Sequence, residues 1–365
     1  MGQSSSAKLP PARFARVVES VRKRMQALNR MMAPAQVNVL EMINGSWVTQ
    51  AIYTAAKFAI PDALANGPLT AEQIANRVGT NPDAAYRLLR ALATLSLCTE
   101  LPDGRFRLTP TGDTLRSDVP NSVRGVALVT GHPVMWGHWG ELTYSVATGK
   151  PAVDKLRGMS LFEYAERNPD VAQVINDGMT CVSTLENPPI LAAYDFSRFR
   201  TIVDVGGGHG LLLGAILHHA PNARGVLYDL ESVVAGAQPI LEAAGASDRC
   251  TVESGSFFDS VPPGGDAYVL KHIIHDWAEP EALKILGNVR KAMNPNGTLL
   301  LVEITIPPGN TPHIGKLLDL EMLVQVTGKE RTAEQYAELL DRAGFRQMRV
   351  VPTVAPISVI EAVPS

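Results

Sequence analysis

The chain has 365 residues and a formal net charge of −3, with 33 Lys and Arg against 36 Asp and Glu. This length allows two domains, and the acidic balance argues against a protein that grips nucleic acid through its phosphates. Apolar runs stay short of the roughly 18–20 residues of a membrane span, no signal-peptide pattern is present, and three scattered cysteines suggest reduced thiols. We therefore expect a cytoplasmic protein that binds neither membrane nor nucleic acid.

Two helices are predicted at the start of the chain. Apolar residues recur at helical spacing over residues 13–32, where the opposite face is basic, and again from Val37 to Phe58. From Leu69 to Leu115 follow two short helices, of which Thr70 can cap the first and Thr80 or Asn81, with Pro82, begins the second. Two strands around a Pro-Asp-Gly turn come next.

This order of helix, turn, helix and β-wing is that of a winged helix. One interpretation is DNA binding through Arg87 and Arg90. A dimer-forming module is favoured, because the second helix carries few cations and the chain is acidic. The first domain is expected over residues 1–120.

Residues 121–190 are expected to be a mostly helical connector. It is rich in aromatic and Met side chains, including Met135, Trp136, Phe162 and Met179. Such residues at helical spacing belong either to a core or to the wall of a pocket for a flat apolar substrate. Asn187-Pro188-Pro189 predicts a break before the next domain.

From residue 191 to residue 365 the pattern alternates strand and helix, which predicts an α/β domain with a parallel sheet and right-handed crossovers. The last two strands are joined by too few residues for a helical crossover, so an antiparallel hairpin is expected at one edge. The predicted strands are Thr201–Val205, Gly225–Leu230, Cys250–Glu253, Ala267–His272, Thr298–Ile304, Met348–Val351 and Ile357–Val363.

The segment Thr201–Gly210, TIVDVGGGHG, predicts a strand, a glycine turn and a helix start. Glycines let the backbone approach a ligand closely. The spacing is GxGxG, whereas the dinucleotide fingerprint is GxGxxG, and this difference, together with the terminal hairpin, disfavours an NAD enzyme. Asp229 ends the second strand, where a carboxylate can accept both hydroxyls of a ribose.

The fourth strand is followed by Lys271-His272-Ile273-Ile274-His275-Asp276-Trp277. Either histidine can serve as a general base near neutral pH. The position of His272 at the strand end favours a structural role for it, whereas His275 begins the following loop or helix and is freer to face a cleft. Two carboxylates, Glu303 and Glu330, are candidates to orient the ring, although Glu330 also fits a solvated Lys-Glu-Arg run.

The motifs DVGGGHG, YDL, LKHIIHDW, LLLVEITIP and TGKERT, in this order, resemble the S-adenosylmethionine-dependent O-methyltransferases of the caffeate and polyketide type. The resemblance covers nearly the whole chain and implies a Rossmann-like catalytic domain behind a winged-helix module that forms a homodimer. It implies that His275 is the catalytic base, supported by Glu303 and Glu330. It further implies that S-adenosylmethionine is the cofactor, without a metal.

The resemblance also assigns binding residues. Cofactor contacts fall on Gly206, Asp229 and Lys271, and on the adenine side Phe257 and Ser256 stand where the family has Met and Asp. Substrate contacts are expected from Met135, Trp136, Phe162, Met179 and Asp276.

The implied reaction moves a methyl group from sulfonium to a hydroxyl of a small aromatic, phenolic or polyketide-like substrate. A phenol titrates near pH 10, so a neutral histidine of pKa near 6.5 suits the removal of its proton. Two alternatives stay open at this point. One is a related enzyme that performs different chemistry on a polyketide, and the other is a DNA-binding regulator with a ligand-sensing domain.

Overall fold

The computed structural model describes Val18, residues 21–22, 24–25 and 28–365. The helix expected over residues 13–32 falls partly outside this description. The chain forms two compact units. The helical unit comprises the described residues of Val17–Gly140 together with Phe162–Leu185, and the sheet unit comprises Glu141–Leu161 with Glu186–Ser365. Among the described residues, no helix combines the length and the apolar character needed to cross a bilayer.

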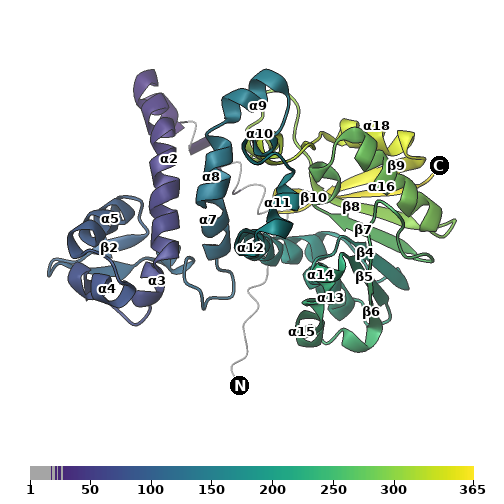
Figure 1. Ribbon diagram of the computed structural model, residues 1–365, viewed down its shortest axis with the longest axis horizontal. Helices are drawn as coiled ribbons and strands as arrows, with labels where there is room; N and C mark the ends of the chain where they lie inside the picture. Colours follow the sequence, from purple (N-terminus) through teal and green to yellow (C-terminus); the bar gives the residue numbers. More distant parts are fainter. Residues whose placement is uncertain (1–17, 19–20, 23, 26–27) are drawn as a thin grey trace. The chain divides into compact units, whose positions relative to one another are not determined.

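The helical unit contains the predicted winged helix. Thr70 and Gln73 form a reciprocal capping box at the start of one helix, and Asn81 caps the next one, with Pro82 in its first turn. The elements of this module and of the helix that precedes it are α2 Ala35–Lys57, α3 Ile60–Ala63, β1 Leu69–Thr70, α4 Ala71–Val78, α5 Pro82–Thr94, β2 Cys98–Glu100 and β3 Arg105–Leu108. The three strands pair in the order β1-β3-β2 (Figure 1).

The remaining helices before the large sheet are short, except for the last one. They are α6 Pro110–Asp113, α7 Arg124–Thr130, α8 Pro133–Trp139, α9 Leu142–Thr148, α10 Ala152–Arg157, α11 Leu161–Arg167 and α12 Pro169–Ala193. The chain has no helix break at Asn187-Pro188-Pro189, because α12 continues through both prolines, although the boundary between the two units falls just before this segment, between Leu185 and Glu186. A proline in a helix removes one N–H donor and crowds the preceding turn, yet Ile190 just beyond is fully buried in the core of the sheet unit. Burial of Ile190 stabilises the helix beyond the two prolines.

The sheet unit is built on seven strands in the order β6-β5-β4-β7-β8-β10-β9. β10 runs antiparallel to both of its neighbours, β8 and β9, and this is the predicted edge hairpin. The pairs β4–β5, β4–β7, β5–β6 and β7–β8 are parallel. The strands are β4 Thr201–Val205, β5 Arg224–Asp229, β6 Cys250–Ser254, β7 Ala267–Lys271, β8 Thr298–Ile304, β9 Phe345–Pro352 and β10 Ile357–Pro364.

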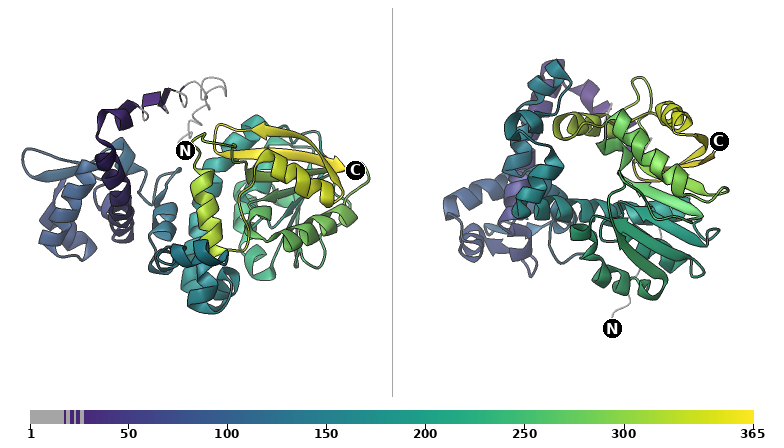
Figure 2. Two further views of the ribbon diagram at one scale, coloured as in Figure 1. Left: turned by 90° about the horizontal axis from the view of Figure 1, so that it is seen from above. Right: turned by 45° about the vertical axis from the view of Figure 1, so that its right-hand side comes forward.

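Helices cover both faces of this sheet, as Figures 1 and 2 show. One core joins the sheet to α13 (Leu211–His219), α15 (Ala237–Ala243) and the end of α12. The other joins it to α16 (Glu279–Ala292) and α18 (Ala333–Arg342). Successive residues of β4 point into different cores: Ile202 packs with α13, and Val203 belongs to the core of α16 and α18. This alternation is expected for a strand buried on both faces. The unit also contains α14 (Glu231–Val234), α17 (Gly315–Gln325) and two short 3-10 helices, η1 Ser247–Arg249 and η2 Ile274–Asp276, the second of which carries His275.

Candidate active site

The glycine turn follows β4 at the carboxyl end of the parallel strands, where open α/β sheets bind ligands. Gly206, Gly208 and Gly210 have φ of 70°, 60° and 81°, a left-handed conformation that other residues rarely adopt. A Cβ on Gly206 would lie 2.4 Å from Cδ1 of Ile273, whereas one on Gly208 would meet no atom within 4 Å. The turn is therefore tightly packed at Gly206 and open at Gly208.

Two carboxyl groups border this turn. The N–H groups of Gly208 and Leu230 donate to Asp229 at 2.8 and 2.7 Å, so that its carboxylate is fixed beside the glycines. Asp204 is 1% exposed and its Oδ2 has no hydrogen-bond partner. Burial raises the pKa of Asp204 to about 7, although Lys271 acts in the opposite direction. An unpartnered buried acidic atom at this place fits a ligand that carries positive charge and donor groups.

Aromatic rings lie next to the turn. The Phe257 ring packs edge-on against Trp277, with centroids 6.0 Å apart, and its Cε1 would be 3.6 Å from a Cβ on Gly206. Ser256 Oγ accepts a hydrogen bond from the Phe258 N–H at 3.2 Å, so its hydroxyl is partly used within the loop. Phe257 thus lies against the glycine turn and offers an apolar surface there, and Ser256 precedes it in the chain.

Lys271 at the end of β7 is paired inside the unit. Its Nζ lies 3.3 Å from Oε2 of Glu186, a residue of α12 that is itself buried. Burial lowers the pKa of Lys271, and the carboxylate of Glu186 counteracts this effect. Oε2 of Glu186 also lies 2.8 Å from Nε2 of His272. No pattern in the sequence points to Glu186, because its partners are far away along the chain.

His275 is held by a set of carboxyl groups from three separate segments. Its Nδ1 lies 3.0 Å from Oε1 of Glu330 and 3.8 Å from Oε2 of Glu303, and its Nε2 lies 3.5 Å from Oδ1 of Asp276. Glu303 is fixed in turn, since its Oε1 accepts the N–H groups of Ile273 and Ile274 at 3.2 and 2.8 Å. The solvated alternative for Glu330 is wrong, because this residue is 2% exposed.

Gly328, the glycine of the TGKERT segment, allows Glu330 to reach His275. A Cβ on Gly328 would lie 1.9 Å from the carbonyl oxygen of His275, so any side chain there would push the two segments apart. Arg331 adds a second link, donating from Nη1 to the Ile274 carbonyl at 3.2 Å. The sequence gives no local sign of this contact.

The same carboxyl groups change the protonation of His275. Burial by itself lowers the pKa of His275, but the negative charges of Glu303, Asp276 and Glu330 outweigh it and raise the pKa to about 10. The expectation of a free histidine near 6.5 is therefore not met. At pH 7 the ring is therefore mostly imidazolium. Only the neutral form, which has lost one proton, can act as a base.

The predicted substrate contacts other than Asp276 belong to the helical unit. Met135 and Trp136 lie on α8, where Met135 is buried, and Phe162 on α11 and Met179 on α12 are 44% and 43% exposed. Their contact with substrate stays a prediction. Asp276 lies beside His275 in the sheet unit.

Comparison with known proteins decides the family. Residues 139–346 match the O-methyltransferase domain and residues 40–118 match the O-methyltransferase dimerisation domain. The chain belongs to the S-adenosylmethionine-dependent O-methyltransferases. The phenazine O-methyltransferase PhzM of Lysobacter antibioticus is 39% identical over 91% of this chain and 97% of its own. The 8-amino-8-demethylriboflavin N,N-dimethyltransferase of Streptomyces davaonensis is 37% identical over 85% and 90%.

Solved structures agree with this assignment. The O-methyltransferase NcsB1 from neocarzinostatin biosynthesis, in complex with S-adenosyl-L-homocysteine and 1,4-dihydroxy-2-naphthoic acid, is 31% identical over 87% of this chain and 96% of its own, with a TM-score of 0.75. The cofactor of the family is thus S-adenosylmethionine. The open glycine turn, the fixed Asp229 and the unpartnered acidic Asp204 fit this cationic cofactor.

Proposed function

We propose that this O-methyltransferase transfers a methyl group to a hydroxyl of a small aromatic acceptor, with His275 as the general base. The buried contact between His275 and Glu330 carries the proposal. It resembles the arrangement in which a carboxylate fixes the ring tautomer and stabilises the imidazolium that forms. The NcsB1 complex, which holds a dihydroxynaphthoic acid, supports an aromatic acceptor.

The cofactor is proposed to lie on the glycine turn, with its ribose on Asp229 and its purine against Phe257 and Ser256. The turn that Gly206 begins is open at Gly208, where the backbone can approach a ligand, and Lys271 contributes charge beside the same turn. When bound, S-adenosylmethionine supplies an electrophilic methyl group on a positively charged sulfur. The protein's main contribution is then to align the acceptor oxygen with this group.

His275 acts through Nε2, because Nδ1 faces Glu330 and Glu303. The neutral ring accepts the proton of the acceptor hydroxyl at Nε2 as the oxygen attacks. Glu330, and Glu303 through its charge, stabilise the imidazolium that results. We propose that Asp276, next to Nε2, helps to orient the acceptor hydroxyl.

A screen of aromatic acceptors tests the function. Purified protein with S-adenosylmethionine and a panel of hydroxynaphthoates, hydroxyphenazines and catechols is expected to yield products that gain one methyl group, detected by mass spectrometry. The matching O-methylated compounds serve as controls and should not react at the blocked oxygen. If no hydroxyl compound gains a methyl group while an amine does, the acceptor is nitrogen, as the name of the riboflavin-related relative indicates for that protein.

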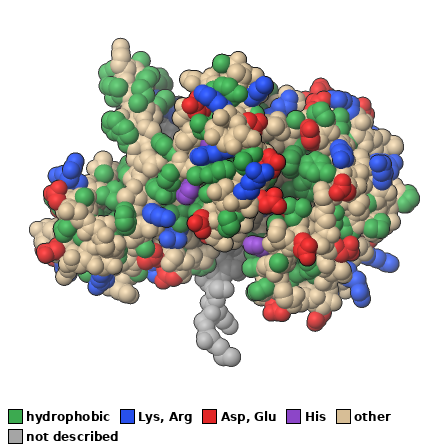
Figure 3. All heavy atoms as spheres, viewed as in Figure 1, with side chains coloured by type: hydrophobic (Ala, Val, Ile, Leu, Met, Phe, Trp, Pro, Cys, Tyr) green, Lys and Arg blue, Asp and Glu red, His purple; other side chains and the backbone are tan. Residues whose placement is uncertain are grey.

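The protein is also proposed to act as a homodimer through the helical unit. Large apolar side chains are exposed along α2, and Figure 3 shows apolar atoms gathered over this helix; they include Val39, Leu40, Met42, Ile43 and Trp47. Exposed apolar patches of this kind mark protein interfaces. A second copy is the proposed occupant, because the dimerisation-domain match, residues 40–118, includes most of this row.

Trp47→Glu is expected to convert the dimer into a monomer, since it places a charge at the residue of this row with the largest exposed fraction, 72%. Light scattering should give twice 39.2 kDa for the parent chain and 39.2 kDa for the variant. Val146→Glu, at an exposed apolar residue of α9, is the control and should leave the mass unchanged. A monomeric parent chain would contradict the proposal.

A further inference from the structure

A second histidine beside the proposed base has no role in the reaction described above. His272 has φ of 55°, a backbone conformation uncommon for a residue with a side chain, and strain of this kind often marks functional sites. Its side chain is 9% exposed. Nε2 is bonded to Glu186 at 2.8 Å, whereas Nδ1 is buried without any hydrogen-bond partner.

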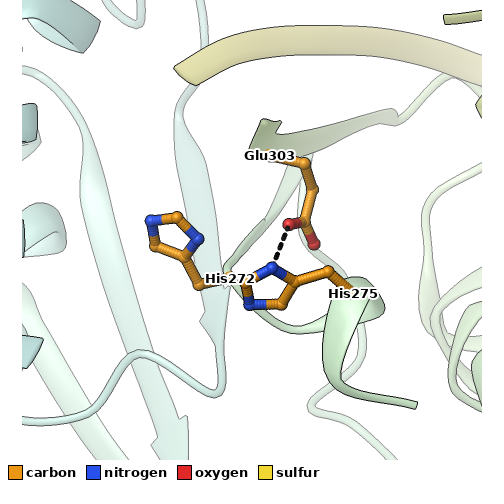
Figure 4. A group of neighbouring side chains, drawn as sticks. All are labelled: His272, His275 and Glu303. Carbon is orange, nitrogen blue, oxygen red and sulfur yellow. Dashed lines mark ion pairs between the residues drawn. The ribbon is translucent and has the colours of Figure 1, made fainter. Parts of the chain in front are cut away.

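An unpartnered carboxylate oxygen lies close to the same place. Glu303 is fully buried, and its Oε2 has no hydrogen-bond partner although Oε1 accepts two backbone N–H groups. One ring nitrogen each of His272 and His275 and one oxygen of Glu303 all lie within 4.8 Å of one another. Figure 4 shows the two imidazoles side by side, with the Glu303 carboxyl beside His275.

These three side chains have the chemistry of a transition-metal site. Two imidazoles and a carboxylate are ligands that Zn²⁺ accepts, with metal–ligand distances of about 2.0–2.2 Å. The pairing of His272 with Glu186 is the usual outer contact of a metal-bound histidine, since the carboxylate fixes the tautomer that leaves the other nitrogen free. Glu303 is likewise oriented by the backbone N–H groups that it accepts.

Charge and distance are compatible with a divalent ion. Four carboxyl groups, those of Glu186, Asp276, Glu303 and Glu330, outnumber the three neighbouring cationic side chains, Lys271, Arg331 and the His275 imidazolium. Tetrahedral ligand atoms around Zn²⁺ are roughly 3.3 Å apart, so separations of up to 4.8 Å must close by side-chain rotation. Mg²⁺ and Ca²⁺ prefer oxygen ligands and fit this nitrogen-containing set poorly.

We propose that His272, His275 and Glu303 form an inhibitory site for Zn²⁺ or a similar late transition-metal ion. The ion is an inhibitor here and not a cofactor of methyl transfer. It binds His275 through Nδ1, the nitrogen nearer Glu303. The proton on Nδ1 is released to solvent, and the ring keeps its proton on Nε2, so His275 can no longer accept one from the acceptor. The inhibition rests on the proposed function, whereas the binding does not.

Metal binding is tested on the tag-free, full-length protein after treatment with a chelator. Calorimetry with Zn²⁺ and absorption spectra with Co²⁺ compare the parent chain with His272→Asn. Asparagine tolerates the left-handed backbone but removes the imidazole ligand. We expect Zn²⁺ affinity to fall by at least about 10–100-fold in the variant. Equal Zn²⁺ affinity in the two proteins would overturn the site, because the ion would then bind elsewhere, for example at exposed histidines.

Inhibition is tested with an acceptor found in the screen. Zn²⁺ should stop turnover of the parent chain, a chelator should restore it, and Mg²⁺ should have no effect. The Zn²⁺ concentration for half inhibition should rise in His272→Asn by the same factor as its affinity falls, while activity without metal is retained. Unchanged turnover with Zn²⁺ bound at the site would overturn the inhibitory role. A chain that methylates no acceptor would instead overturn the proposed function, and calorimetry would still decide the site.

Discussion

His275→Ala is expected to lower the rate of methyl transfer by about 10²–10⁴-fold, the contribution that a positioned acid or base makes to proton transfer. The acceptor hydroxyl then has no group to take its proton. S-adenosylmethionine binding should persist, because the proposed cofactor residues Gly206 and Asp229 lie on other segments of the sheet unit. Turnover is measured by product mass, and cofactor binding by calorimetry.

Loss of stability is a second effect of this substitution, and it needs a control. Alanine leaves the buried carboxyls of Glu330 and Glu303 without their partner, and breaking a buried pair costs about 3–5 kcal/mol. His275→Gln retains an amide that can donate to Glu330 but cannot act as a base. A glutamine variant that binds cofactor normally and still turns over at most of the parent rate would contradict the role of His275.

The pH dependence of kcat/KM is expected to be steep. The pKa of His275 lies above the ordinary 6.5, at about 10, so only a small fraction of the free enzyme holds the neutral base at pH 7. The rate should rise about tenfold for each pH unit from 7 and level off near pH 10. The same shift stabilises the fold fully below pH 6.5, and this contribution is lost as the pH rises through 10. Initial rates across this pH range measure the rate profile, and denaturant unfolding at the same pH values measures the change in stability.

A phenol that ionises in solution would also produce a rising profile, so a variant must separate the two causes. Glu303→Gln removes one of the charges that raise the pKa of His275 while its amide oxygen can still accept from Ile273 and Ile274. The midpoint should fall by about one to three pH units if His275 is responsible. An unchanged midpoint would assign the profile to the acceptor.

Much of the fold could be predicted because its signals are local. Thr70 and Asn81 mark helix starts by caps that bond three residues ahead. The predicted strands Thr201–Val205 and Thr298–Ile304 agree with β4 and β8, since continuous apolar runs between turn residues are typical of buried parallel strands. The short link before Ile357 correctly predicted the antiparallel hairpin. At Pro188-Pro189 the local rule failed, because tertiary packing there outweighs the loss of a helix hydrogen bond.

By itself, the sequence determined the family, the α/β class and the glycine turn, because each depends on residues close together in the chain or on ordered motifs. Tertiary structure alone decided the surroundings of the two histidines. Glu330 meets His275 only because Gly328 lets two distant segments touch, and Glu186 meets His272 across 86 positions. A pKa depends on the distance to each charge and on the exclusion of water, and the spacing of residues along the chain determines neither of these. His275 therefore became a strongly held imidazolium, and its neighbour His272 a candidate metal ligand, only once the chain was folded.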